Sequence, residues 1–257
     1  IYFALNHTNA ATSLLRQIMS KTVSNRQLHA KIKYIEGNWA ELLSSSNSKT
    51  IIKTYSQSLD IYKTAKAHLA LAVLADNCVM SLVNNLEQNS KESFQNQAKQ
   101  QSTKPSIFPQ KEQQKQQQQQ PQNNLSISVE VRKNSLFWTG SGRNKEILSY
   151  FLDFLPLSLL NYMQAMIMSP DYSYEIVPRI LVLLFDVGHY MIKSSSNNND
   201  IFKMLSSNSK VKILSKMKES IESNLNKVKS SIWVNSITQL ISRIEQPKPL
   251  EDILFKL

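Results

Sequence analysis

Glycine scarcity is the feature that most limits what this chain can fold into. Only 4 of the 257 residues are glycine, whereas an average usage of about 7% would supply roughly 18. Phosphate-binding loops, strained catalytic turns and tight β-hairpins need glycine, because other residues reach those backbone conformations only at a steric cost. The composition therefore favours helices and argues against a complete nucleotide-binding or hydrolase site.

Apolar residues in the second half of the chain recur at intervals of three and four, as on one face of a helix. The positions that predict a buried face are Leu157, Leu160, Met163, Met166 and Ile167. This spacing breaks at residues 169–171, where Ser-Pro-Asp predicts a turn. The two flanking helices should form a helical hairpin, which cannot bury its apolar face without further hairpins stacked on it.

The helix after the turn has two possible starts. Pro178 is compatible with a helix that begins near Val177, and also with an earlier helix that is kinked there. The run from Ile180 to Phe185 is apolar on every side, which is typical of a helix packed on more than one face. Gly188 is expected to end it in a left-handed conformation.

Similar patterns predict helices elsewhere in the chain. The expected ranges are 2–19, 25–35, 49–61, 65–86, 144–168, 201–228, 232–244 and a last one from residue 250. Ser48 and Asp200 are the expected N-caps of two of them. Glu36-Gly37-Asn38 is expected to end the second of these helices.

One segment has a different composition from the rest. Residues 95–124 are rich in glutamine, with an unbroken run at 116–120, and such a segment buries too little apolar surface to offset its ordering entropy. Residues 125–132 alternate like an isolated strand, or are irregular. We therefore expect an all-α fold, an α-solenoid of stacked TPR/HEAT-like hairpins, with helical blocks at 1–94 and 143–257 around a mostly disordered insert at 95–142.

The net charge of +11 could indicate binding to nucleic acid or to an acidic partner. However, residues 91–133 hold seven Lys/Arg and three Glu, so a net +4 of that charge lies in a segment expected to be disordered. No aromatics interleave with the lysines, as a stacking groove for nucleic acid requires. Direct nucleic-acid binding is thus disfavoured. The single cysteine, Cys78, fits a reducing compartment. We also expect no membrane span, and a segment of a longer protein.

No candidate for catalysis, cofactor binding or metal binding emerges from the residue patterns. The histidines at 7, 29, 68 and 189 lack metal-ligand spacing, and His68 is expected to be a packed or rim residue. Ser141 lies between two glycines but lacks the rest of a nucleophile elbow. Asp153-Phe154-Leu155 lacks the glycine of the kinase metal-binding tripeptide.

Three sets of residues resemble the FAT region of the phosphatidylinositol-3-kinase-related protein kinases, in the same order. Val177 to Gly188 is similar to the family's Pro-Arg-x-Leu-x-Leu-Trp-x-Asp-x-Gly segment, with Leu184 where tryptophan is usual. Residues 232–244 are similar to a downstream helix that contains Gln-Leu-Ile-Ser-Arg, and residues 34–76 to upstream repeats. The residues that carry the resemblance are Trp39, Asp76, Pro178, Arg179, Leu181, Phe185, Asp186, Gly188, Trp233, Gln239, Leu240 and Arg243.

The resemblance leans toward the ATR-like members of the family, with the ATM-like members second. It implies a nuclear serine/threonine kinase of DNA-damage signalling, in which this segment is a non-catalytic scaffold that clamps the kinase domain. It implies ATP and magnesium for the kinase domain only, partner subunits, and a possible homodimer of the parent. The alternative hypothesis is an independent α-solenoid adaptor that binds proteins. A third hypothesis is a basic protein that binds nucleic acid.

Overall fold

The computed structural model describes residues 8–43, 46–101, 143–188 and 206–242, with the backbone alone at 85–101 and 143–147. Within these ranges every regular element is helical and no strand occurs, so this part of the chain is all-α as predicted. The helices are α1 (Thr8–Lys21), α2 (Arg26–Leu42), α3 (Ser48–Ile61), α4 (Ala65–Gln101), α5 (Arg143–Met168), α6 (Ser173–Leu181), α8 (Ser207–Leu225), α9 (Ser231–Val234) and α10 (Ile237–Ile241). A 3₁₀ turn, η2 (Pro170–Tyr172), precedes α6, and a π-helical segment, η3 (Val182–Val187), follows it.

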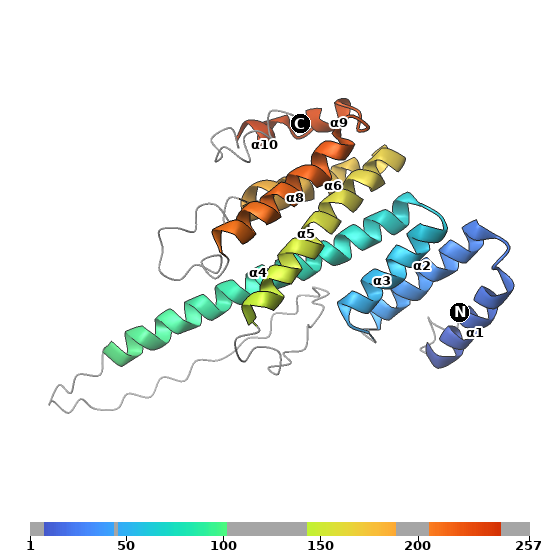
Figure 1. Cartoon of the computed structure of the whole chain (residues 1–257), viewed down its shortest axis with the longest axis horizontal. Coiled ribbons are helices and arrows are strands. Elements are labelled where there is room, and N and C mark those ends of the chain that lie inside the picture. The colour runs from blue at the N-terminus through green and yellow to red at the C-terminus, as the bar shows by residue number, and fades with distance from the viewer. Residues whose placement is uncertain (1–7, 44–45, 102–142, 189–205, 243–257) are drawn as a thin grey trace, which may run out of the picture.

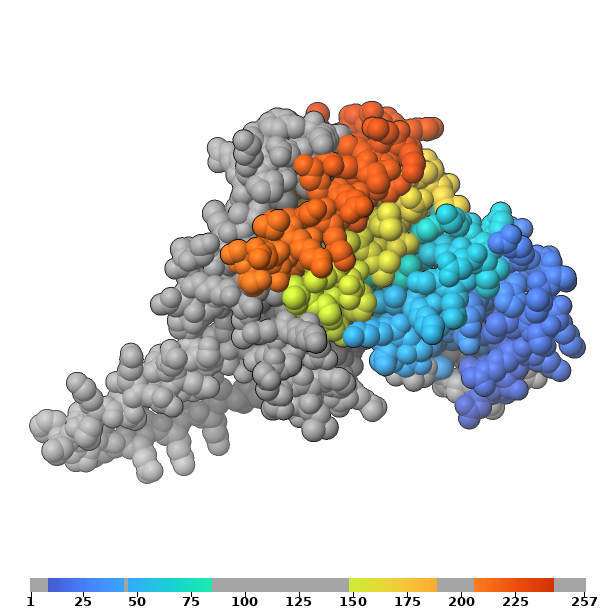
Figure 2. Space-filling view, in the orientation of Figure 1, coloured from blue at the N-terminus to red at the C-terminus, as the bar shows by residue number. Residues whose placement is uncertain are grey.

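Helix α4 connects the two halves of the molecule. Its 37 residues would extend about 55 Å at the usual rise per residue, and it crosses the molecule diagonally (Figure 1). Helix α3 packs against it from the upstream side and α5 from the downstream side, while α2 lies on α3 and α8 on α5. Helix α1 packs against α2 at the far upstream end, and Figure 2 shows it at the edge of the molecule.

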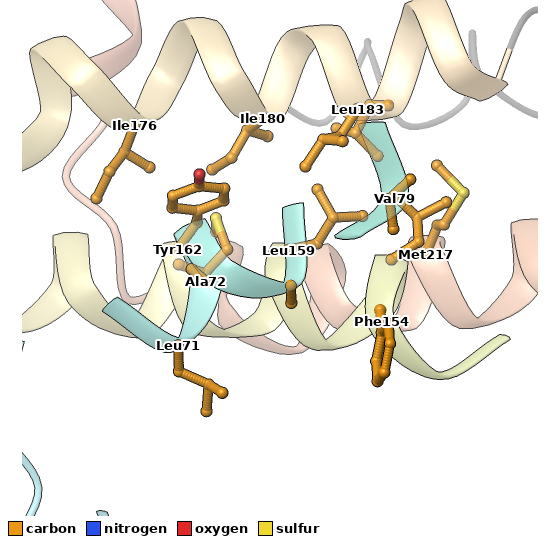
Figure 3. Close-up of a cluster of buried hydrophobic side chains, with 14 of the residues drawn as sticks. Leu71, Ala72, Val79, Phe154, Leu159, Tyr162, Ile176, Ile180, Leu183 and Met217 are labelled. Atoms are coloured by element: carbon orange, nitrogen blue, oxygen red, sulfur yellow. The ribbon is translucent and has the colours of Figure 1, made fainter. Parts of the chain in front are cut away.

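The core lies where α4, α5, α6, η3 and α8 meet. Figure 3 shows buried apolar side chains from these elements, with Ile176, Ile180 and Leu183 facing Tyr162 and Leu159. The labelled members of the cluster are Leu71, Ala72, Val79, Phe154, Leu159, Tyr162, Ile176, Ile180, Leu183 and Met217. Aliphatic and aromatic side chains of this kind stabilise the folded state by removing apolar surface from water.

The predicted buried face of α5 is partly wrong. Met163 and Met166 are fully buried, but Leu157 is half-buried and Leu160 is exposed. The face that packs on α4 and α8 includes Leu159 in place of Leu160. Because this helix has apolar residues on several sides, spacing alone did not identify which side its neighbours cover.

The structure around Pro178 decides between the two predicted helix starts and contradicts the predicted conformation of Gly188. Pro178 lies inside α6, which begins at Ser173, so the earlier start is the correct one. The run from Ile180 to Phe185 is packed on several sides as predicted, with Phe185 at 0% exposure. Gly188 does not adopt the predicted left-handed conformation: its φ is −62°, and its N–H donates to the carbonyl oxygen of Phe185 in a continuing helical turn.

Gly37 does not end the second helix, contrary to prediction. It lies within α2, which continues to Leu42. A Cβ atom at this position would lie 2.8 Å from Cε1 of Tyr55, so the glycine lets the Tyr55 ring of α3 pack directly on the α2 backbone. The cap of α3 is also one residue earlier than predicted, because the side chain of Asn47, rather than Ser48, accepts from the N–H of Thr50.

Two further boundaries differ from prediction. Residues 95–101, predicted to be disordered, form the last turns of α4. The single helix predicted over 232–244 is divided into α9 and α10 at Asn235 and Ser236, residue types that favour turns because their side chains compete for backbone hydrogen bonds. The predictions for residues 1–7, 102–142, 189–205 and 243–257, which include Asp200, Arg243, the possible strand and the last helix, lie outside the described residues.

Two segments are long and apolar enough to cross a membrane by length and composition, although the sequence analysis expected none. They are Ala65–Asn84 in α4 and Leu148–Met168 in α5, and more than half of each, 56% and 61%, is buried inside the protein. Core helices that pack on each other have the same length and composition. This evidence for a membrane span is therefore weak.

Candidate functional site

A buried carboxylate joins three helices at the centre of the molecule. Asp76 of α4 accepts a hydrogen bond from the hydroxyl of Tyr162 on α5, with 2.9 Å between the oxygens. Arg179 of α6 donates through Nε and Nη2 to the two carboxylate oxygens of Asp76, at 2.9 and 2.7 Å. We call these three residues the Asp76 junction. A bidentate pair of this geometry fixes both the distance and the relative orientation of the helices.

The electrostatics of the Asp76 junction keep the Tyr162 hydroxyl and the Arg179 guanidinium protonated. Burial and the nearby Asp76 charge raise the pKa of the Tyr162 hydroxyl, so it remains a donor. Burial alone would lower the pKa of Arg179, but hydrogen bonding and attraction to Asp76 outweigh that effect and raise it. The Asp76 side chain is 2% exposed and that of Arg179 is 41% exposed, so water screens the guanidinium but hardly reaches the carboxylate.

Two further polar contacts connect α4 and α5. The Nδ1 atom of His68 lies 2.7 Å from Oδ1 of Asn161, whose Nδ2 donates to the carbonyl oxygen of Leu157. Because Asn161 presents its oxygen to His68, Nδ1 carries the hydrogen and the buried Nε2 has no hydrogen-bond partner among the described residues. Ser158 also donates to the carbonyl oxygen of Ala72.

Helix α8 is attached to α5 by two polar contacts beside the apolar core. Gln164 donates to the side-chain oxygen of Asn224 at 2.7 Å, and Lys216 donates to the carbonyl oxygen of Leu152 at 3.2 Å. Together with Met217 in the core, these contacts fix α8 along α5.

The upstream helices have a smaller polar contact of their own. Tyr55 of α3, fully buried, donates to a carboxylate oxygen of Glu41 on α2 at 2.8 Å. Burial and this hydrogen bond raise the pKa of the Tyr55 hydroxyl. Tyr34 of α2 stacks at an angle on Tyr55, with 5.7 Å between ring centroids, and Nζ of Lys66 on α4 lies 5.8 Å from the Tyr34 centroid. Contacts from three helices therefore meet at this position as well.

The Asp76 junction has the arrangement of a structural contact rather than that of a catalytic or metal site. Asp76 already accepts from three donors and its side chain is buried, whereas a general base or metal ligand needs a lone pair that a substrate or an ion can reach. No cluster of three or more His, Cys, Asp or Glu side chains suited to a metal ion occurs among the described residues. Cys78 is half-buried, and burial raises the pKa of its thiol, which disfavours the reactive thiolate.

The residues that carry the resemblance occupy different environments. Asp76 and Arg179, 103 positions apart, are in direct contact, and Leu181, Phe185, Gly188 and Trp233 are buried. Trp39, Pro178 and Leu240 are half-buried, Asp186 and Gln239 are exposed, and Arg243 lies outside the described residues. Some of the residues that carry the resemblance therefore lie in the core, and others lie at the surface.

The sequence analysis missed Tyr162, Asn161 and Ser158 as polar partners in the core. Tyr162 lies one position before the predicted core residue Met163. Its hydroxyl on an otherwise apolar helix was the signal that could have indicated a buried hydrogen bond.

The chain matches no protein-family model, and no curated protein or solved structure is significantly similar to it. Its function must therefore be argued from its own residues.

Proposed function

We propose that this chain is a non-catalytic helical scaffold, the FAT region of an ATR/ATM-like serine/threonine protein kinase, and that it clamps and regulates a kinase domain elsewhere in the parent protein. The observation that carries the proposal is the bidentate contact between Asp76 and Arg179. Both residues belong to the resemblance, in segments 103 positions apart. Segments that resemble one family in the same order are better supported when their residues pack together.

The order of packing supports an α-solenoid as the finer description of the fold. Each of α2, α3, α4 and α5 packs on the next, and α8 continues the series on α5. In a solenoid each hairpin packs mainly on its neighbours, so displacement of one hairpin is passed to the next. Such a frame suits a clamp whose geometry a partner subunit could change.

Regulation by such a frame needs no catalytic residue within it. Packed helical interfaces switch between discrete arrangements, and a partner that binds one arrangement more tightly shifts the population toward it. The parent kinase would act in the nucleus in DNA-damage signalling and phosphorylate Ser or Thr followed by Gln, with ATP and magnesium bound in its own kinase domain. The Asp76 junction would hold the frame in the arrangement that positions that domain.

The test uses the whole parent protein, purified from its source cells, in a phosphorylation assay with a Ser-Gln peptide, ATP and magnesium. We expect activity in the parent and none in the 257-residue chain alone. Arg179→Ala in the parent should change the rate of activation by its partner subunits and leave the KM for ATP unchanged. The matched control is Lys212→Ala, which removes an exposed cation from α8.

Two results would contradict the proposal. A parent protein without kinase activity that still binds other proteins through this chain would favour the independent adaptor. Phosphorylation of the peptide by the isolated chain would show that a catalytic site exists within it.

A further inference from the structure

The upstream end of the molecule exposes more apolar surface than α2 covers. Ala11 and Leu15, one turn apart on α1, are buried, and α2 is the helix that α1 packs against. Leu14 and Ile18 are also one turn apart and lie on the adjacent side of α1, where they are 42% and 39% exposed. The apolar face of α1 is therefore wider than its contact with α2.

The exposed apolar residues continue from α1 into the next element. Val23 in the turn is 67% exposed and Leu28 in the first turns of α2 is 42% exposed. The turn is tight, since Thr22 N–H donates to the carbonyl oxygen of Met19 and Asn25 N–H to that of Thr22. We define Leu14, Ile18, Val23 and Leu28 as the upstream apolar surface. Helix α1, which carries the first two, lies at the edge of the molecule in Figure 2.

Positive charge borders this surface without any acidic residue nearby in the sequence. The first 35 residues contain five Lys/Arg and no Asp or Glu. The four exposed cations are Arg16, Lys21, Arg26 and Lys31, and the fifth pairs with Glu36. Lys21 lies three positions after Ile18 on α1, and Lys31 lies three positions after Leu28 on α2, so each cation is on the same side of its helix as that apolar residue.

We propose that the upstream apolar surface docks an amphipathic helix of a partner protein, with an apolar stripe flanked by Asp or Glu. The stripe would cover Leu14 and Ile18, as helices bind other helices through residues spaced three and four apart. The acidic flanks would face Lys21 and Lys31, which sets orientation and speeds association. This inference does not depend on the kinase assignment.

Charge complementarity decides between this occupant and the other candidates. A second copy of the chain would bring two surfaces of like charge together, which is unfavourable. A nucleic acid would be held by the cations but would leave the apolar side chains uncovered, since phosphate contacts use charge alone. An acidic amphipathic helix satisfies both features at once.

The experiment measures fluorescence anisotropy of labelled 18-residue peptides titrated with the intact 257-residue chain. One peptide is a designed helix with a leucine stripe and flanking glutamates, the second replaces every glutamate by lysine, and the third is a scrambled version of the first. We expect the lysine and scrambled peptides to bind at least about tenfold more weakly than the first, a difference of about 1.4 kcal/mol.

Variants of the chain locate the binding. Leu14→Glu combined with Ile18→Glu should weaken binding of the acidic peptide at least tenfold, whereas Val211→Glu, at a 65% exposed valine on α8, should leave it within twofold. Lys21→Glu combined with Lys31→Glu tests the charges with the apolar residues intact, and should weaken binding of the acidic peptide and strengthen that of the lysine peptide. Circular dichroism confirms that each variant folds.

Other outcomes would overturn the proposal. Equal binding of the scrambled peptide would mean simple charge attraction. Binding to vesicles with 30% phosphatidylserine, without binding of the acidic peptide, would assign the surface to a membrane. A dimer in sedimentation that Leu14→Glu and Ile18→Glu dissociate would assign it to a second copy. No binding of the acidic peptide at 100 μM would also overturn the proposal.

Discussion

The Asp76 junction and the upstream end of the chain are built from similar helices but packed to very different extents. In the core around the junction, Ile180, Leu183 and Phe185 are fully buried, and the Asp76 carboxylate joins α4, α5 and α6. At the upstream end, Leu14 and Ile18 remain substantially exposed, and α2 is the helix that α1 mainly packs against among the described residues. A helix with several neighbours buries all sides, so we expect stability to be concentrated at the junction and binding at the upstream end.

The largest effect should follow from a cavity in the core. Phe185→Ala removes a ring that is 0% exposed, and it should lower the free energy of unfolding by about 3–5 kcal/mol in urea denaturation. The corresponding change at the surface, Val211→Ala, should stay within about 0.5 kcal/mol. A loss below about 1 kcal/mol for Phe185→Ala would show that the core is loosely packed and the contrast overstated.

Removal of the guanidinium should have the next largest effect. Arg179→Ala leaves the Asp76 carboxylate buried with Tyr162 as its remaining donor, and should cost about 3 kcal/mol, at the low end for a buried pair because Arg179 is itself partly exposed to water. Thermal or urea unfolding measures the loss. If Asp76→Asn in the Arg179→Ala background gave no recovery of stability, an uncompensated charge would not be the cause.

The fold class followed from the sequence, but the core polar contacts did not. Scarce glycine and spacing of three and four predicted helices, and the all-apolar run before Phe185 predicted burial on several sides. Periodicity could not predict that Tyr162 meets Asp76, because a contact across 86 positions depends on which helices pack together. The resemblance did single out Asp76 and Arg179, although it gave no reason for their contact.

Gly37 shows why a local signal can be overruled. Glycine lowers helix propensity, so an interruption was expected after residue 35. The ring of Tyr55 occupies the space where a side chain would lie, and its packing between α2 and α3 outweighs a propensity cost of about 1 kcal/mol. Leu160 is a second case, since the exposed side of α5 is set by the positions of α4 and α8.

This explanation predicts the sign of a glycine substitution. In an exposed helix Gly→Ala stabilises by up to about 1 kcal/mol, but Gly37→Ala should destabilise by about 2 kcal/mol because its Cβ would meet the buried Tyr55 ring. The double variant with Tyr55→Leu, measured by urea unfolding, should show a smaller penalty for the alanine. Stabilisation by Gly37→Ala alone would mean that α2 and α3 separate readily.

The smallest predicted effect is a pH dependence at the contact between α4 and α5. Burial lowers the pKa of His68, and Lys63 adds to the shift while the hydrogen bond to Asn161 opposes it. The unfolded chain therefore binds a proton more readily, so the contribution of His68 is complete above about pH 6.5 and declines as the pH falls toward its lower folded pKa.

The comparison of wild type with His68→Gln by urea unfolding, between pH 7.5 and 5, isolates this contribution. Wild type should lose more stability than the variant on acidification, by at most about 1.4 kcal/mol per pH unit. His29→Gln provides the histidine control on α2. Equal pH profiles for wild type and His68→Gln would show that folding does not lower the pKa of His68.

Native-state hydrogen exchange of the intact chain with and without Arg179→Ala tests most directly whether the Asp76 junction holds the helices together. We predict that in the wild type the slowest amides lie in α4, α5 and α6 and that those of α1 exchange faster. In the variant, amides of α4 near Asp76 and of α5 near Tyr162 should lose protection together with α6, while the order relative to α1 is kept. Loss of protection confined to α6 would contradict the account.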